Sequence, residues 1–215
     1  QEIYNGDPVY VQDGRPANRE IYSEISGVLK DHRGYFRPHY RDNFGLATFV
    51  RKGLEITNEG EVYIYKEKGY ESESEVGDHA RILQSISFKI GEGDLHVFNL
   101  HGVWQRGAGK TDNENRIEQS ERAISYIEQF GGSKILCGDF NLLPETKSIH
   151  MIEDSGMKNL ITKYGITSTR TSYYKKEDVF ADYVFVNEEV KVSSFEVMKE
   201  EVSDHAALKL VFELK

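Results

Sequence analysis

Apolar side chains recur at every second position along several stretches of the chain, which is the period of a half-buried β-strand. The clearest stretch is 81–100, where Ile82, Ile86 and Phe88 share one face and residues 91–94 form a Gly-rich turn before the next apolar run. This pattern predicts a β-hairpin. Further strands are predicted at residues 44–50, 56–66, 134–137, 181–186, 190–198 and 206–214.

Helical spacing of apolar residues marks three other stretches. Residues 16–31 carry a proline at the first turn, residues 115–130 stop at Gly131-Gly132, and residues 145–154 follow Pro144. Residues 1–12 and 67–79 are polar and contain glycines, so both are predicted to be loops. Residues 161–176 fit neither period, and their structure is left open.

These elements predict one α/β domain spanning residues 1–215, because no repeat, linker or low-complexity tract divides the chain. Many strands, several joined as hairpins, accompany only a few helices. We therefore expect two mixed, mostly antiparallel sheets that pack face to face, with helices outside.

Composition narrows the classes of partner. The net charge of −9 and the pI near 5.3 argue against a broad basic surface for nucleic acid, although a local basic strip stays compatible with them. Cys137 is the only cysteine and lies in an apolar strand, which indicates a structural thiol. No apolar run approaches a membrane span and no signal peptide is visible. We expect a cytoplasmic monomer, with secretion left open because the first residue is not methionine.

The candidate chemistry centres on residues 135–141, where an apolar strand ends in Gly-Asp-Phe-Asn. Residues two apart at a strand end point the same way, so Asp139 and Asn141 would aim a carboxylate and an amide at one spot. Such groups can hold a metal, take a proton or orient a water. Gly-Asp and Asn are also ordinary turn residues, and a plain turn is an equal alternative for this stretch alone.

Four other stretches place ionisable groups beside apolar strands: Glu2, Asn99-Leu100-His101, Asp182-Tyr183 and Ser203-Asp204-His205. Taken singly, each fits a capped strand end or a solvated corner. Taken together, they favour a site, because functional residues gather at one edge of layered α/β folds. Carboxylates, amides and imidazoles are the groups that metal-assisted attack of water on a phosphate requires.

The five motifs, in this order along the whole chain, resemble those of the endonuclease/exonuclease/phosphatase superfamily, which includes the DNase I-like nucleases. Gly138-Asp139-Phe140-Asn141 and Ser203-Asp204-His205 are the most specific parts of the resemblance. It implies a four-layered α/β sandwich. It also implies a cofactor, Mg²⁺ or Mn²⁺, held by Glu2 and Asp204.

The same resemblance implies a role for each remaining candidate. Asp139 would orient or deprotonate the attacking water, and Asn141 would contact the phosphate. His205, kept charged by Asp182, would contact the scissile phosphate, and His101 would help to protonate the leaving group. Substrate contacts are expected from Arg81 and from the loop at residues 102–113, which contains Trp104 and Arg106.

The family's first strand and helix have no counterpart before Gln1, so we expect an N-terminally incomplete domain. The predicted function is a Mg²⁺-dependent phosphoesterase acting on a phosphodiester or a phosphomonoester. A catalytically weak member that binds phosphate ligands or nucleic acid is the alternative. The aromatic and cationic stretches 35–41, 104–110 and 170–176 are candidate substrate surfaces. DNA, RNA, an inositol phosphate and a phospholipid headgroup all remain open as substrates.

Overall fold

The computed structural model describes residues 1–6, 20–72 and 77–215. Its strands are β1 (Ile3–Tyr4), β2 (His32–Tyr40), β3 (Phe44–Arg51), β4 (Glu55–Tyr65), β5 (Arg81–Ile90), β6 (Gly93–His101), β7 (Ser133–Asp139), β8 (Lys158–Asn159), β9 (Asp182–Val186), β10 (Val190–Val197) and β11 (Leu208–Leu214). Its helices are α1 (Ile21–Val28), α2 (Glu114–Ile127), α3 (Lys147–Asp154) and α4 (Leu160–Lys163).

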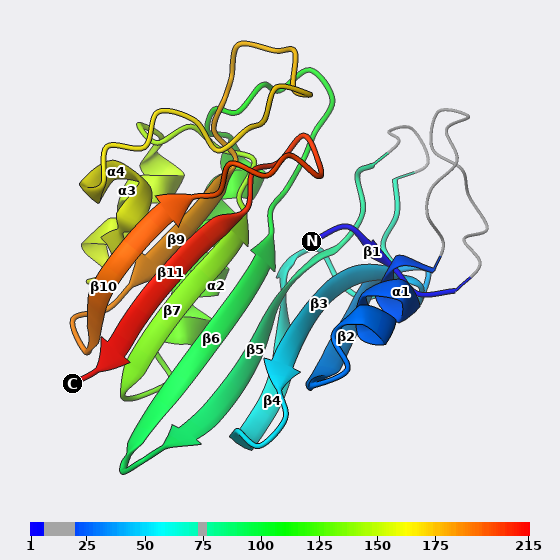
Figure 1. Ribbon diagram of the computed structural model, residues 1–215. Coiled ribbons are helices and arrows are strands. Elements are labelled where there is room, and N and C mark those ends of the chain that lie inside the picture. Colours follow the sequence, from blue (N-terminus) through cyan, green and yellow to red (C-terminus); the bar gives the residue numbers. More distant parts are fainter. Residues whose placement is uncertain (7–19, 73–76) are drawn as a thin grey trace.

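A six-stranded sheet in the order β4-β5-β6-β7-β9-β8 forms the centre of the molecule (Figure 1). Adjacent strands of this sheet pair antiparallel, except β6 and β7, which run parallel. The β5–β6 hairpin turns at Gly91, whose positive φ of 61° suits glycine. The parallel pair needs a long crossover, and α2 supplies it.

The second layer consists of two separate sheets, β1-β3-β2 and β10-β11. Strands β2 and β3 pack over β5 and β6, whereas β10 packs over β7. Gln84 of β5 joins the layers, because its amide donates to the backbone oxygen of Tyr35 and accepts from the hydroxyl of Thr48. A polar side chain can thus be buried between two sheets with its hydrogen bonds satisfied.

Helices occupy the outside of both layers. Helix α2 packs on β4 and on α3, α4 packs on β9, and α1 packs on β1 and β2 (Figure 1). The side chain of Asn113 accepts a hydrogen bond from the backbone nitrogen of Arg116 and so caps the start of α2. Within the described ranges, no helix is long and apolar enough to cross a membrane.

The layered α/β architecture with packed sheets and few helices is confirmed, and several boundaries are corrected. Residues 32–40 form β2, a strand that the aromatic and basic pattern of 34–43 did not reveal, since both faces carry polar residues. The helix predicted at 16–31 begins at Ile21 in the described part, and residues 16–19 lie outside it. The described residues of the predicted loops 1–12 and 67–79 include β1 and an isolated bridge between Glu71 and His79; residues 7–12 and 73–76 lie outside the described residues.

The core between the large sheet and α2 generates a stability prediction. Phe98 is fully buried, and its ring lies 5.2 Å from Phe130 and 6.3 Å from Tyr126, measured between centroids. Phe98→Ala should lower the free energy of unfolding by about 3–5 kcal/mol, because it leaves a cavity. Val211→Ala, at an exposed position, should cost less than about 1 kcal/mol. Chemical denaturation measures both, and equal losses in the two variants would contradict this account of the core.

Candidate active site

Sheet register places three of the candidate residues in one row at an edge of the large sheet. His101, the last residue of β6, lies opposite Asp139, the last residue of β7, and Asp139 lies opposite Asp182, the first residue of β9. The row follows from the parallel pairing of β6 with β7 and the antiparallel pairing of β7 with β9. Residues far apart in the sequence therefore meet without any contribution from loops.

Two glycines allow the backbones of β6 and β7 to stay in close contact where the chain leaves this row. A Cβ at Gly138 would lie 1.9 Å from the backbone oxygen of Leu100, and the φ of Gly138 is +147°. A Cβ at Gly102 would lie 2.5 Å from the backbone oxygen of Phe140. No side chain fits at either position, so the two strand ends stay side by side as they enter their loops.

Asp139 and Asn141 are oriented by a local turn. The backbone nitrogen of Asn141 donates to Oδ1 of Asp139 at 2.8 Å, and Asn141 adopts a left-handed φ of 54°. One oxygen of the Asp139 carboxylate is thereby fixed. The turn and the site, which the sequence left as alternatives, coexist here: the turn aims both side chains into the cavity described below.

His205 bridges the two carboxylates of the row. Its Nδ1 hydrogen-bonds Oδ2 of Asp182 at 2.7 Å, and its Nε2 lies 3.7 Å from Oδ2 of Asp139. Burial alone would lower the pKa of His205, but the hydrogen bond and the charges of Asp182 and Asp139 raise it above 6.5. The charged imidazolium that the resemblance implied therefore has a physical basis in this structure.

Among the described carboxylates, Asp139 has the most strongly shifted pKa. Burial, and after it the charge of Asp182, raise the pKa of Asp139 to about 6, although His205 and Arg170 oppose the rise. A carboxylate with a raised pKa is a stronger base than an ordinary surface aspartate. Asp139 thus combines a fixed orientation with the capacity to take a proton near neutral pH.

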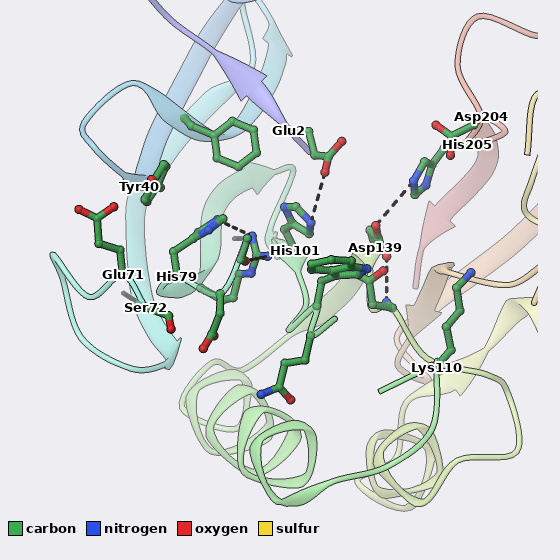
Figure 2. Close-up of a pocket in the computed structure, with 18 of the residues that line it drawn as sticks. Glu2, Tyr40, Glu71, Ser72, His79, His101, Lys110, Asp139, Asp204 and His205 are labelled. Atoms are coloured by element: carbon green, nitrogen blue, oxygen red, sulfur yellow. Dashed lines mark hydrogen bonds and ion pairs between the residues drawn. The ribbon is translucent and has the colours of Figure 1, made fainter. Parts of the chain in front are cut away.

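Glu2 reaches the same cavity from the second layer. Strand β1 pairs with β3, and the side chain of Gln1 donates to Oδ1 of Asn99 at 3.0 Å, which holds these first residues over β6. Oε1 of Glu2 then lies 4.0 Å from Nε2 of His101. Figure 2 shows Glu2 beside His101, with Asp204 and His205 beyond Asp139.

His101 belongs to a buried cluster of imidazoles around Arg81. Its ring lies 5.8 Å from that of His39, which in turn stacks on His79 at 5.2 Å, and Nη1 of Arg81 contacts Nε2 of His79. Burial, followed by the charge of Arg81, holds the pKa of His101 well below 6.5 and lowers that of His79 to about 2. His101 is therefore a neutral hydrogen-bonding group, and no carboxylate of the described residues hydrogen-bonds its Nδ1.

A cavity of about 670 Å³ gathers these side chains. Of the residues proposed from sequence, eight line it: Glu2, Arg81, His101, Trp104, Asp139, Asn141, Asp204 and His205. Asp182 is buried behind His205. Arg106 is exposed and does not line the cavity, so the structure gives it no contact with a substrate there.

Other lining residues come from the three aromatic and cationic stretches that were left as candidate surfaces. They include Tyr40, Arg41, Gln105, Lys110, Arg170, Tyr174 and Lys176. Arg170 donates to Oδ2 of Asp204 at 2.9 Å, a partner that no local sequence signal indicated. The mixture of aromatic and cationic residues in each stretch was the only signal, and it did not single out individual side chains.

The conformation of the loop at residues 102–113 is held by hydrogen bonds from α2. Arg116 is fully buried, and its guanidinium donates to the backbone oxygens of Val103, Gly109 and Thr111. The loop is thereby attached to a helix at several points. Trp104 and Lys110 are carried into the cavity wall as a result.

The donors of the cavity suit a hard dication. Glu2, Asp139 and Asp204 supply carboxylate oxygens, and Asp139 is buried beside a second carboxylate, an arrangement that a cation relieves. In the described part of the chain, no three His, Cys, Asp or Glu side chains already converge on one point. Mg²⁺ is commonly held by one or two carboxylates with water and substrate phosphate completing its shell, so these residues fit it.

Comparisons by sequence find a family match but no curated relative. The model of the Endonuclease/Exonuclease/phosphatase family matches residues 1–205. A search of the curated proteins finds no match.

Solved structures share the fold at low identity. An endonuclease/exonuclease/phosphatase from Bacteroides vulgatus superposes with a TM-score of 0.72 at 18% identity, over 90% of this chain and 80% of that one. A mannosyl-6-phosphatase from Bacteroides thetaiotaomicron gives 0.70 at 17%, over 89% and 80%. The human Nocturnin catalytic domain with bound sulfate gives 0.67 at 16%, over 90% and 76%.

The His205–Asp182 pair predicts a pH dependence of stability. Because the pKa of His205 is raised on folding, the pair stabilises the folded state fully below about pH 6.5, the unfolded value, and the contribution is lost as pH rises through the raised pKa. In Asp182→Asn the effect of burial is opposed only by the charge of Asp139, so the pKa of His205 should fall. NMR titration of the imidazole measures this shift, and the exposed His150 serves as an internal control. An unchanged His205 titration would contradict the pairing.

Proposed function

This chain belongs to the endonuclease/exonuclease/phosphatase family, whose members hydrolyse phosphoester bonds, and we propose that it hydrolyses a phosphate ester by Mg²⁺-assisted attack of water. The observation that carries the proposal is the buried Asp139 carboxylate. It is fixed by Asn141, lies 3.7 Å from His205 and faces the cavity. The arrangement joins a base, a cationic imidazole and carboxylate donors around one space.

Each side chain has a distinct task in this proposal. Asp139 accepts the proton of the attacking water, for which its raised pKa of about 6 is suited. The His205 imidazolium and the Asn141 amide stabilise the charge that develops on the phosphoryl oxygens. Asp182 keeps His205 charged and oriented through the 2.7 Å hydrogen bond.

Glu2 and Asp204 would hold the dication, which we propose to be Mg²⁺, with Mn²⁺ as a substitute. When bound, it neutralises charge on the phosphate and on the leaving oxygen. The leaving-group role that the resemblance implied for His101 stays a prediction. Without substrate or dication, burial and then the charge of Arg81 hold the pKa of His101 well below 6.5, and its Nε2 lies 4.0 Å from Oε1 of Glu2.

Two features favour a compact phosphate ester over a long nucleic acid. The described side chains that line the cavity include six Asp or Glu and five Lys or Arg, so the wall has no strong positive excess. Non-specific nucleic-acid binding depends on such an excess. A mannosyl-6-phosphatase is one of the proteins that share the fold, which is compatible with a small substrate.

Replacement of the proposed base tests this function. Asp139→Asn should reduce Mg²⁺-dependent hydrolysis of phosphate esters by about 100- to 10,000-fold, because it removes a proton acceptor. The matched control is Asp94→Asn, since Asp94 is exposed and lies at the hairpin turn away from the cavity. EDTA should abolish the wild-type activity, and Mg²⁺ should restore it.

The assay should compare a panel of sugar and inositol phosphates, duplex and abasic DNA, RNA and sphingomyelin. Activity that survives EDTA or Asp139→Asn would contradict the mechanism. Binding without turnover on every member of the panel would support the alternative of a phosphate-binding module.

A further inference from the structure

Two cations pack against one aromatic ring in the cavity wall. Cζ of Arg170 lies 4.4 Å from the ring centroid of Tyr174, and Nζ of Lys110 lies 4.8 Å from the same centroid. All three side chains line the cavity. Cations over a tyrosine ring are attracted by its π-electrons, so the ring holds two positive charges close together.

The guanidinium of Arg170 has a hydrogen-bond donor that no described residue uses. Its side chain is only 6% exposed, and Nη1 donates to Oδ2 of Asp204 at 2.9 Å. Its Nε is buried and has no hydrogen-bond partner among the described residues. A buried guanidinium with unused donors is costly unless another acceptor is supplied.

The backbone fixes Arg170 relative to the catalytic groups. Residue 170 forms a bridge with His205, and the backbone nitrogen of Thr171 donates to the oxygen of Asp204. On the other side, Oγ1 of Thr169 accepts from the backbone nitrogens of Ala181 and Asp182. The guanidinium is therefore held by the same segments that position His205 and Asp182.

Arg81, the arginine expected to contact the phosphate, is more fully occupied. Its Nη1 contacts His79, and its Nη2 donates to the backbone oxygen of Gly77. Of these two buried arginines, Arg170 has the larger unused capacity. Sequence position alone did not distinguish them.

The charge of Lys110 adds to that of Arg170. Nζ of Lys110 donates to the backbone oxygens of Asp178 and Phe180, which are neutral acceptors. Burial, and after it the charge of Arg170, lower the pKa of Lys110 to about 8, and the charges of Asp139, Asp178 and Asp182 oppose the fall through space. Asp204 would interact with both Arg170 and a bound dication, so it would neutralise the charge of Arg170 only in part. This wall therefore suits an anion of more than one charge.

We propose that Arg170, backed by Lys110 across the Tyr174 ring, binds a phosphoryl oxygen of the substrate and selects a dianionic phosphate monoester over a monoanionic diester. The inference rests on the proposed function in taking a phosphate ester as the ligand. It adds a binding residue and a substrate class. The selectivity arises because a second negative charge gains more from two nearby cations than a single charge does.

Calorimetric titration tests the proposal without turnover. The probes are methyl phosphate, a dianion above its second pKa of about 6, and dimethyl phosphate, a monoanion. At about pH 7 with Mg²⁺ present, where the monoester is mostly a dianion and Lys110 is still mostly charged, the wild-type chain should bind methyl phosphate about tenfold more tightly than dimethyl phosphate. Arg170→Gln should weaken methyl phosphate binding by about tenfold or more and affect dimethyl phosphate less.

The matched control is Arg122→Gln, an arginine on the outer helix α2 that pairs with Glu118 away from the cavity. Its affinities should equal those of the wild type. An unchanged affinity for methyl phosphate in folded Arg170→Gln, or an equal loss for both probes, would overturn the proposal.

If Arg170→Gln does not fold, Arg170→Lys decides. It keeps the charge but loses the planar fork, so it should bind methyl phosphate several-fold more weakly, and undiminished binding would overturn the proposal. In Arg170→Ala, added guanidinium should restore part of the affinity, which a purely structural role would not produce. Arg170-dependent binding of methyl phosphate would stand even if no ester were hydrolysed, so the two proposals fail separately.

Discussion

Two carboxylates that lie next to each other at a buried strand end repel each other, and a nearby cation stabilises them. The rest of the site depends on the group that supplies this positive charge. Asp139 and Asp182 face each other across β7 and β9, and both are shielded from water. His205 lies between them and contacts both. Burial, and after it the charge of Asp182, raise the pKa of Asp139. Against the effect of burial, the hydrogen bond to Asp182 and the charges of both carboxylates raise the pKa of His205. A base and an acid of opposite charge are thus produced by one arrangement, and neither would have these properties alone.

The sheet provides this arrangement, and the loops complete it. Register alone aligns His101, Asp139 and Asp182, since the pairing of β6, β7 and β9 fixes their positions within the same row. His205 comes from outside the row and is held there by residues 169–171. The loop that carries Trp104 and Lys110 into the cavity wall is attached to α2 through Arg116. Strands therefore carry His101, Asp139 and Asp182, while anchored segments outside the strands carry His205, Trp104 and Lys110.

The sequence predicted what depends on short-range pattern. Alternation identified the hairpin of β5 and β6, and the motifs around Asp139 and His205 identified residues that do meet in one cavity. It missed β2, whose faces are both partly polar. It also did not resolve residues 161–176, which combine the short helix α4 with loop hydrogen bonds and one isolated bridge. The ion pair between Arg170 and Asp204 joins positions 34 apart, and no local periodicity encodes such a contact. The division of the second layer into two sheets is likewise a property of long-range pairing.

The neutral histidine cluster and the cationic wall give the cavity two chemically different sides. Around Arg81, burial has removed the charge of His39, His79 and His101, so a single cation is surrounded by neutral rings. Around Tyr174, Arg170 and Lys110 both keep hydrogen-bond donors at the cavity wall. A phosphate between them meets hydrogen-bonding groups on one side and positive charge on the other. In the proposed binding mode, the anionic end of an ester would lie toward Arg170, and the remainder of the molecule would extend toward the imidazoles and the aromatic ring of Tyr40.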